Sequence, residues 1–315
     1  MHAAHHITVP AELAGFHEDF DGEAGRSWVA ALPELAARFL NRWGLRIDGP
    51  ASHGMVALVL PVLREDGTPA ALKLQPVTDE SAGEPTALGA WNGDGAVALL
   101  DHDAATGTML LERLDANRSL LSIPDAEAAL QTLAELLGRL LKAPAPTGLR
   151  SLGDVAGAML KDVPTALAEL RDPSERRLVE TCAGAVREVV GEPGGLLLHW
   201  DLHYANVLAP VPGSAREPWL AIDPKPLVGD AGFELLPALH DRWDDVTATG
   251  DVRRAVLRRF DLMTDVLGLD RRRAARWTLG RVLQNALWDV EDEEDALAPE
   301  QVEIARALQR YAVRD

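Results

Sequence analysis

The run HWDLHYANVL at positions 199–208 has the spacing H-x-D-x-x-x-x-N, in which His199, Asp201 and Asn206 are the polar members. It lies between two apolar runs, so we expect a loop between two strands. Seventeen residues after Asn206, the apolar stretch WLAI ends in the carboxylate of Asp223. Phosphoryl transfer from ATP needs one carboxylate to orient the attacking hydroxyl, and an amide and a second carboxylate to hold Mg²⁺. The pattern therefore predicts a small-molecule kinase, with Asp201 as catalytic base and with Asn206 and Asp223 as magnesium ligands.

A simpler interpretation of Asp201 and Asn206 is ordinary turn chemistry, because Asp and Asn side chains readily bond to nearby backbone. That interpretation leaves unexplained why Asp223 ends a buried-looking strand at the appropriate distance. His199 and His203 flank the loop. We expect them to be structural hydrogen-bonding residues, since no cluster of Cys and His residues supports a zinc site.

Lys73 lies in the alternating stretch AALKL at 70–74, where a strand lysine is costly unless its ammonium has a partner. A point charge on a flexible stem suits nucleotide phosphates. Glu84 follows eleven residues later in a predicted helix and is placed to pair with Lys73. The alternative is a solvated lysine and an ordinary surface glutamate. Their order before the Asp201 motif favours a phosphate-anchoring pair.

Two further segments are candidates for nucleotide binding. Gly54, between the first two predicted strands, is the single glycine available to let backbone N–H groups approach phosphate. Glu112 and Leu114 lie in the segment that joins the two predicted lobes, where backbone groups would read an adenine. A plain edge strand and linker fits that segment equally well.

The order of elements predicts an α+β fold with two lobes, as in protein kinases. The first lobe, residues 1–113, is expected to hold leading helices and then five short strands and one main helix. The expected strands are 45–52, 56–63 (broken by Pro61), 70–74, 96–100 and 108–111, with the helix at 80–91. The second lobe, residues 114–315, is expected to be helical and to carry the catalytic loop and the acceptor site. Its predicted helices are 125–142, 152–170, 176–190, 235–243, 252–267, 272–290 and 299–312.

The chain is acidic, with 49 Asp and Glu residues against 31 Lys and Arg residues and a formal net charge of −18. This charge disfavours nucleic acid and anionic membrane surfaces as partners, and it suits a cationic small molecule. General acidity that serves only solubility explains it equally well. Cys182 is the single cysteine, so no internal disulfide is possible. The start, Met1 to His6, lacks a signal-peptide core, and its histidines are too few for a metal site. We expect a cytoplasmic protein, and no oligomeric state is predicted.

Three stretches resemble the aminoglycoside phosphotransferases, and most of all their streptomycin 6-kinase and hydroxyurea phosphotransferase group. They are the run at 199–208, IDPKPLVGD at 222–230 and QNALW at 284–288. The similarity extends from about residue 13 to 294, and IDPK with its VGD continuation is its most specific part. The resemblance implies a protein-kinase-like fold, use of ATP and Mg²⁺, and transfer of the γ-phosphoryl group to a hydroxyl of a small antibiotic. By position it makes Lys73 and Glu84 the phosphate-anchoring pair, Asp201 the base, and Asn206 and Asp223 the metal ligands.

One departure from the family pattern is Trp200, which stands where the family usually has glycine. Its side chain either lies beside the acceptor or packs into the lobe, and it bears on the substrate more than on the chemistry.

A streptomycin-like acceptor carries guanidinium groups, which carboxylates hold by charge-assisted hydrogen bonds. The candidate carboxylates of the acceptor site are Asp230, Glu234, Asp241, Asp289 and Asp292, and Trp288 is a further candidate beside them. Trp288 and Asp292 share a helix face with Asn285. A solvated helix end explains the acids at 293–295, and Trp288 fits a plain core residue equally well.

Three functional hypotheses follow. The leading one is an ATP-dependent kinase of an aminoglycoside-like acceptor. The second is a kinase of hydroxyurea, an amino sugar or another small metabolite. The third, from a different class, is a pseudokinase that binds nucleotide without transfer.

Overall fold

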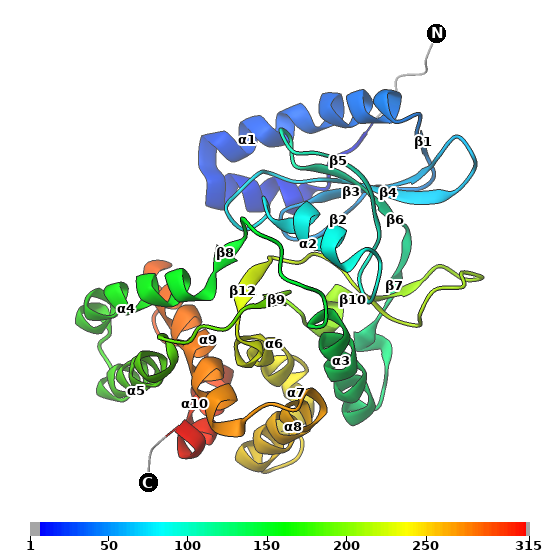
Figure 1. Cartoon of the computed structure of the whole chain (residues 1–315). Helices are drawn as coiled ribbons and strands as arrows, with labels where there is room; N and C mark the ends of the chain where they lie inside the picture. Colours follow the sequence, from blue (N-terminus) through cyan, green and yellow to red (C-terminus); the bar gives the residue numbers. More distant parts are fainter. Residues whose placement is uncertain (1–6, 313–315) are drawn as a thin grey trace. The chain divides into compact units, whose positions relative to one another are not determined.

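The computed structural model of the protein describes residues 7–312, so the early histidines lie outside the described residues. The chain forms two compact units (Figure 1). The first contains the residues up to Asp115 together with Pro210–Arg216, and the second contains Ala116–Ala209 and the residues from Glu217 onward.

The first unit is built on a six-stranded sheet with the order β1-β3-β4-β6-β5, in which β2 also pairs with β3. The strands are β1 (Arg46–Ile47), β2 (Ser52–His53), β3 (Leu58–Leu63), β4 (Pro69–Leu74), β5 (Leu99–Asp103) and β6 (Thr108–Glu112). The single weak strand predicted over 45–52 is thus two short strands, which makes six strands instead of five. The strand predicted at 96–100 also begins later, at Leu99.

Pro61 does not break its strand, contrary to the prediction. It lies inside β3, opposite Ala71 of β4, and its carbonyl accepts a hydrogen bond from the Asp48 N–H at 2.9 Å. On that side β3 pairs with β1 only at Val62 and Leu63 and with β2 only at Leu58 and Val59. Pro61 falls in the gap between these two short strands. Its missing N–H therefore costs the sheet no ladder hydrogen bond.

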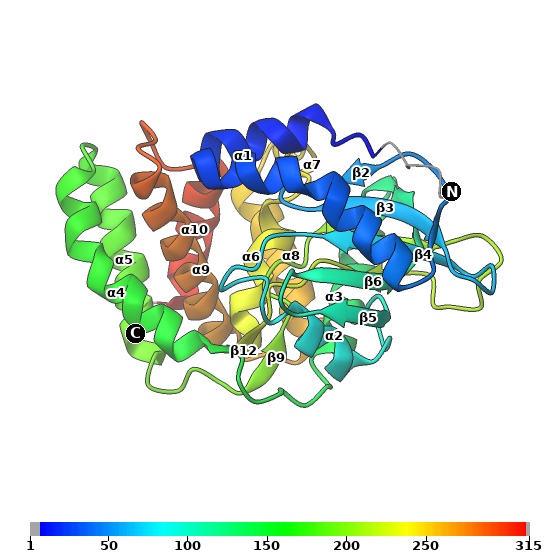
Figure 2. The ribbon, with the colours of Figure 1, turned by 90° about the horizontal axis from the view of Figure 1, so that it is seen from above.

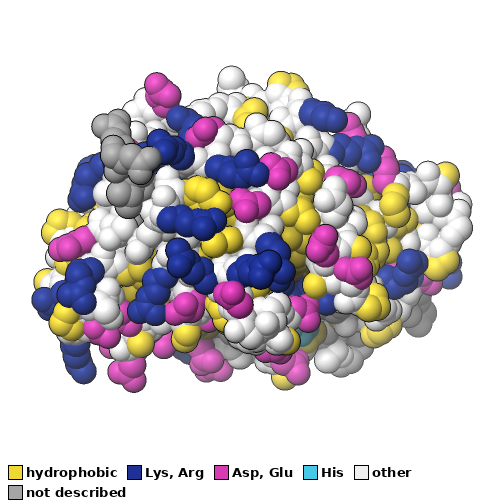
Figure 3. Space-filling model, turned by 90° about the horizontal axis from the view of Figure 1, so that it is seen from below, with side chains coloured by type: hydrophobic (Ala, Val, Ile, Leu, Met, Phe, Trp, Pro, Cys, Tyr) yellow, Lys and Arg dark blue, Asp and Glu magenta, His cyan; other side chains and the backbone are white. Residues whose placement is uncertain are grey.

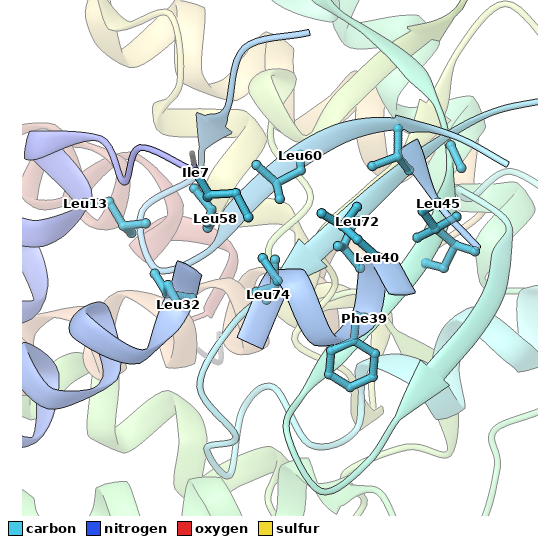
Figure 4. Close-up of a cluster of buried hydrophobic side chains, with 14 residues drawn as sticks. Ile7, Leu13, Leu32, Phe39, Leu40, Leu45, Leu58, Leu60, Leu72 and Leu74 are labelled. Atoms are coloured by element: carbon cyan, nitrogen blue, oxygen red, sulfur yellow. The ribbon is translucent and has the colours of Figure 1, made fainter. Parts of the chain in front are cut away.

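The long helix α1 (Ala11–Arg42) runs across one face of this sheet, as Figure 2 shows. It bends at Gly22, whose φ of 56° and ψ of −125° are not helical. Phe39 and Leu40 of α1 belong to one buried apolar cluster with leucines of β3 and β4, and Leu40 lies beside Leu72 (Figure 4). The short helix α2 (Glu84–Trp91) ends at Asn92, which has a left-handed conformation. The apolar cluster between α1 and the sheet anchors β4, the strand that carries Lys73.

The second unit is mainly helical. Most of its helices begin close to where the apolar periodicity predicted them, but the helix predicted over 235–243 ends at His240, and a short helix that was not predicted follows at Trp243–Thr247. The helices are α3 (Ala126–Leu140), α4 (Leu152–Glu169), α5 (Pro173–Val189), α6 (Leu235–His240), α7 (Trp243–Thr247), α8 (Val252–Leu267), α9 (Arg271–Glu291) and α10 (Pro299–Ala312). Asp125, Asp172, Asp251 and Asp270 cap four of them through side-chain bonds to backbone N–H groups. Such caps satisfy donors that a helix start leaves unpaired.

Short strands of the second unit carry the motif at 199–208. One three-stranded sheet has the order β11-β10-β7 and another has the order β8-β12-β9. The strands are β7 (Leu114–Ser119), β8 (Arg150–Ser151), β9 (Leu196–Leu198), β10 (Val207–Pro210), β11 (Leu220–Ala221) and β12 (Leu227–Gly229). The chain passes from the first unit to the second within β7.

Two surface properties bear on partners. On the face shown in Figure 3, basic and acidic side chains are interspersed, so the acidic excess does not form one continuous negative field there. Among residues 7–312, no helix combines the length and the apolar character needed to cross a bilayer.

Candidate active site

Two strand pairs bring the polar loops of the second unit together. β9 pairs with β12 so that Leu198 lies opposite Leu227, and β10 pairs with β11 so that Val207 lies opposite Ala221. The loop 199–206 and the loop 222–226 therefore leave the same two strand pairs. Backbone hydrogen bonds also join the loops, from the Ile222 N–H to the Asn206 carbonyl at 2.9 Å and from the Lys225 N–H to the His199 carbonyl at 3.0 Å.

This arrangement places Asp201, Asn206 and Asp223 on two adjoining loops. The Asn206 side-chain amide donates to the Asp201 carbonyl at 2.9 Å, which orients its Oδ1 as the remaining acceptor. Asp223 has a φ of 58°, a left-handed conformation that aspartate adopts more readily than most residues. The sequence spacing predicted this juxtaposition, but the roles of the three side chains remain predictions.

The side-chain oxygens gathered here fit a Mg²⁺ site only if a bound substrate supplies further oxygen ligands. Within residues 7–312, no group of three or more His, Cys, Asp or Glu side chains is arranged to hold a metal ion. Mg²⁺ in kinases typically takes one or two carboxylates from the protein and completes its shell with phosphate oxygens and water. One carboxylate, Asp223, and one amide oxygen, from Asn206, fit that pattern.

His199 supports the loop from inside. Its ring is buried, Nε2 lies 3.0 Å from the Ile222 carbonyl, and the Asp201 N–H donates to Nδ1 at 3.3 Å. Burial lowers the pKa of His199 to about 4, although the charges of Asp201 and Asp223 oppose this change. A neutral ring with Nδ1 as acceptor and Nε2–H as donor satisfies both bonds. His199 is a structural hydrogen-bonding residue, as predicted.

Trp200 packs into the lobe, which decides between the two placements left open by the sequence. Its side chain is buried, and the guanidinium groups of Arg150 and Arg281 lie 4.5 and 5.1 Å from its ring centroid. Its φ of 66° lies in the region that favours glycine. The cation–π contacts and burial of the indole offset this backbone cost.

Glu234 holds the backbone of Trp200. Its Oε1 accepts the Trp200 N–H at 2.6 Å, and its side chain is buried. Burial raises the pKa of Glu234 to about 7, whereas the Trp200 N–H and the charge of Arg281 act in the opposite direction. The burial of Glu234 and its bond to the backbone give it a structural role that needs no ligand, and its role toward an acceptor stays a prediction.

Lys73 and Glu84 form the predicted pair within the first unit. The Lys73 ammonium lies 2.8 and 2.9 Å from the two Glu84 carboxylate oxygens, and the side chains are 6% and 2% exposed. Gln75 donates a further hydrogen bond to Glu84 at 2.6 Å. The carboxylate thus holds the ammonium at a fixed point of β4.

The other nucleotide-binding candidates have less distinctive surroundings. No heavy atom lies within 4 Å of the position that a Cβ would take on Gly54. The Glu112 carboxylate accepts hydrogen bonds from the Ala98 N–H and from Arg216, at 3.1 and 2.8 Å, so local structure already engages it. Leu114 is the first residue of β7.

The remaining acceptor-site candidates also bind within the chain. Asp230 caps a short 3₁₀ helix through the Gly232 N–H and pairs with Arg273 at 2.6 Å. Asp241 accepts the N–H groups of Tyr204 and Arg242. These contacts give both carboxylates a structural role that does not require a ligand.

At the end of α9 the candidates differ in exposure. Asp289 accepts the Ala298 N–H at 3.2 Å, and burial raises its pKa. Asp292 is the exposed C-cap residue of the helix. Trp288 is 39% exposed and lies over the Arg281 guanidinium at 5.4 Å, so it is not a plain core residue.

Two residues near the candidate groups were not predicted as functional. His17 of α1 is buried and contacts the Val56 carbonyl through Nε2 at 3.1 Å, which anchors the loop after Gly54. Lys225 places its ammonium 3.4 Å from Asp201 Oδ2. Lys225 could have been recognised from its position inside the IDPK stretch, whereas no local sequence pattern marks His17.

The family described as aminoglycoside/hydroxyurea antibiotic resistance kinase matches residues 42–293. The chain belongs to this family. The kinase is 57% identical to streptomycin 6-kinase of Streptomyces glaucescens, over 97% of this chain and 98% of that protein. It is 56% identical to hydroxyurea phosphotransferase of Kitasatospora aureofaciens, over 96% of this chain and 86% of that protein.

Solved structures extend the comparison to the fold of the kinase. Aminoglycoside phosphotransferase APH(4)-Ia, in a ternary complex with ADP and hygromycin B, matches with a TM-score of 0.58 at 14% identity. The match covers 89% of this chain and 99% of that chain. A choline/ethanolamine kinase family protein from Mesorhizobium loti matches with a TM-score of 0.53 at 17% identity, over 84% of this chain and 94% of that chain. The predicted family, the protein-kinase-like α+β fold and the phosphotransferase class are confirmed.

Proposed function

We propose that this kinase transfers the γ-phosphoryl group of Mg·ATP to a hydroxyl of a streptomycin-type aminoglycoside. The observation that carries the proposal is the joining of the loops at 199–206 and 222–226, which gathers one candidate base and two candidate magnesium ligands. Relatives from two Streptomyces species, at 57% and 55% identity over nearly the whole chain, are streptomycin 6-kinases and support this acceptor. The net charge of −18 suits a cationic substrate.

In this proposal Asp201 orients the acceptor hydroxyl and receives its proton as the oxygen attacks phosphorus. Asn206 and Asp223 hold Mg²⁺, which neutralises charge on the phosphates. Lys73 holds phosphate oxygens, and Glu84 keeps its ammonium in place. Catalysis by such a set is positioning and electrostatic stabilisation, because phosphoryl transfer asks for little covalent chemistry from the protein.

A second acceptor is favoured by a specific observation. The Kitasatospora relative, at 56% identity, is a hydroxyurea phosphotransferase, and it is as similar to this chain as the streptomycin kinases are. Hydroxyurea also presents a hydroxyl to the base, so the same loops serve it. The pseudokinase hypothesis is disfavoured, since the chain retains Lys73, Glu84, Asp201, Asn206 and Asp223.

The test is mass-spectrometric detection of ATP-dependent phosphorylation over streptomycin, other aminoglycosides, hydroxyurea and amino sugars. We expect one added phosphate on streptomycin. A product on hydroxyurea alone would move the assignment to the second acceptor. No product from any acceptor, with Mg·ADP still bound, would support the pseudokinase hypothesis.

Two variants test the roles. Asp201→Asn should lower the transfer rate by about 10²–10⁴-fold with little change in Mg·ADP affinity, because the base acts on the acceptor. Asp223→Ala should weaken Mg·ADP binding by about tenfold or more, roughly 1.4 kcal/mol, and leave metal-free ADP binding unchanged. Loss of ADP affinity in Asp201→Asn, or unchanged Mg·ADP affinity in Asp223→Ala, would count against these roles.

A further inference from the structure

The turn that joins β2 to β3 carries two backbone donors that the chain does not use. The Gly54 N–H donates to the Ala57 carbonyl at 3.0 Å, which closes the turn. Met55 at its tip is 74% exposed. Within residues 7–312, neither the Met55 N–H nor the Val56 N–H donates a hydrogen bond. Successive N–H groups of a turn form a concavity that binds anions, so this turn is suited to phosphate.

The register of the sheet places this turn near Lys73. Ser52 lies opposite Val59, which lies opposite Lys73, so the three residues form one row across β2, β3 and β4. The leucines that alternate with Val59 and Lys73 belong to the buried cluster of α1 and the sheet, so Lys73 lies on the face that α1 does not cover. Two strand spacings of about 4.8 Å separate β2 from β4, about 10 Å in all. The turn at 54–57 starts two residues after Ser52 and follows directly on the row with the phosphate-anchoring ammonium.

His17 of α1 holds this turn through its backbone. The ring Nε2 lies 3.1 Å from the Val56 carbonyl. A carbonyl only accepts, so Nε2 carries the hydrogen of this bond. On the other side of the ring, Nδ1 lies 2.7 Å from Asp21 Oδ2. A proton lies between these two atoms, since two bare acceptors would repel each other at this distance, and the bond fixes the orientation of the ring.

The bend of α1 brings His17 to the turn. After Gly22 the chain folds back so sharply that a Cβ on Gly25 would collide with the His17 carbonyl. The rings of His17 and Trp28 then lie 4.5 Å apart, between centroids. His17 is 1% exposed, so water does not compete for its bonds. An apolar side chain would fill this buried space without a polar group to satisfy, and packing alone therefore gives a weak reason for a histidine here.

We propose that His17 is a positioning residue, which holds the turn at 54–57 in the conformation that binds the phosphates of Mg·ATP. The inference rests on the proposed function. The Met55 and Val56 N–H groups donate to phosphate oxygens, and His17 itself does not touch the nucleotide. By fixing the Val56 peptide, it lowers the entropy that the turn loses when the nucleotide binds.

The experiment compares His17→Leu, His17→Gln and the control His102→Leu, which removes an exposed histidine of β5. Calorimetry gives the affinities for Mg·AMP-PNP and for adenosine, which has no phosphate. Leucine fills the space without a donor, whereas the glutamine amide keeps a donor for the Val56 carbonyl. We expect His17→Leu to weaken Mg·AMP-PNP binding by about fivefold, or roughly 1 kcal/mol, and to leave adenosine binding within about twofold of wild type. His17→Gln and His102→Leu should bind both ligands within about twofold of wild type.

Two further measurements do not depend on the folding of His17→Leu. Asp21→Ala, at a position 49% exposed, releases the ring of His17 and should weaken Mg·AMP-PNP binding by about threefold without changing adenosine binding. In the wild type, hydrogen exchange of the segment 52–58 should slow when Mg·AMP-PNP binds and should not change with adenosine.

The outcomes separate positioning from simple stabilisation of the first unit. An equal loss of AMP-PNP and adenosine affinity in His17→Leu or Asp21→Ala, unchanged AMP-PNP affinity in both, or no protection of the turn by Mg·AMP-PNP would overturn the inference. If the wild type binds Mg·AMP-PNP but transfers to no acceptor, the proposed function fails, and the ratio of the two affinities still decides the role of His17.

Discussion

Replacing Glu234 by glutamine tests whether a buried carboxylate supports the backbone beside Asp201. Glu234 is 1% exposed, and its Oε1 accepts the Trp200 N–H at 2.6 Å. Burial raises its pKa from 4.5 to about 7. Glutamine keeps the carbonyl acceptor and stays neutral, so it resembles the protonated side chain at every pH. The variant therefore isolates the cost of ionising Glu234.

The sign of the pH dependence follows from the direction of this change. The folded protein binds the proton more tightly than the unfolded chain, so the stabilising contribution is complete below pH 4.5 and is lost as the pH rises through about 7. One pKa unit corresponds to about 1.4 kcal/mol, which makes the loss about 3 kcal/mol above pH 7. We expect Glu234→Gln to match the wild type near pH 4.5 and to be more stable by about 3 kcal/mol at pH 8.

The assay is denaturant unfolding of both proteins at several pH values between 4.5 and 8. Glu135→Gln, at an exposed position of α3, is the matched control and should show no such pH-dependent gain. Glu234→Ala should instead destabilise the protein by about 3–5 kcal/mol, because it leaves both a void and an unpaired buried N–H. A stability difference between Glu234→Gln and wild type that does not change with pH would refute the reasoning.

Two other substitutions test the packing around the proposed groups. Lys73→Met should destabilise the protein by about 3–5 kcal/mol, because it strands the Glu84 carboxylate in the interior. The double variant Lys73→Met/Glu84→Gln should recover part of this loss in denaturant unfolding, and simple additivity would argue against the buried pair. Gly232→Ala should lower the free energy of unfolding by about 1–3 kcal/mol, because its Cβ would lie 2.7 Å from the Ala274 Cα. Gly157→Ala, with open space around it inside α4, should be neutral or stabilising in the same measurement, and a loss at this position would contradict the steric argument.

Local patterns predicted the helices of the second unit well, and the sheet of the first unit less well. Helices such as α3 depend on apolar spacing and on a nearby cap, Asp125, and both can be recognised within a few residues. Strands depend on partners far along the chain. Pro61 looked like a break in its strand because the gap between its neighbours β1 and β2 exists only in the assembled sheet.

The candidate active-site residues also differ in how well the sequence predicted them. The spacing of Asp201, Asn206 and Asp223, and the order of Lys73 before Glu84, predicted a small-molecule kinase. The family came from the resemblance of longer stretches, IDPKPLVGD at 222–230 above all. The acceptor carboxylates were chosen by charge and by position along the chain, and neither distinguishes a solvent-facing carboxylate from one engaged by the chain. Asp230, for example, is paired with Arg273, forty-three residues away.

The sequence by itself determined the family, through the resemblance of three stretches to known kinases. It also determined the order of the elements and the residue types available for chemistry, because these depend on composition and on spacing along the chain. Only the tertiary structure decided that Trp200 packs inward, that Glu234 binds its N–H and that Lys225 lies against Asp201. The physical reason is that burial and contact between distant residues arise from packing. Trp200 and Glu234 are 34 residues apart in sequence, and the bond from the Trp200 backbone N–H to the Glu234 carboxylate exists because the strand pair and the helices around it exclude water from both groups.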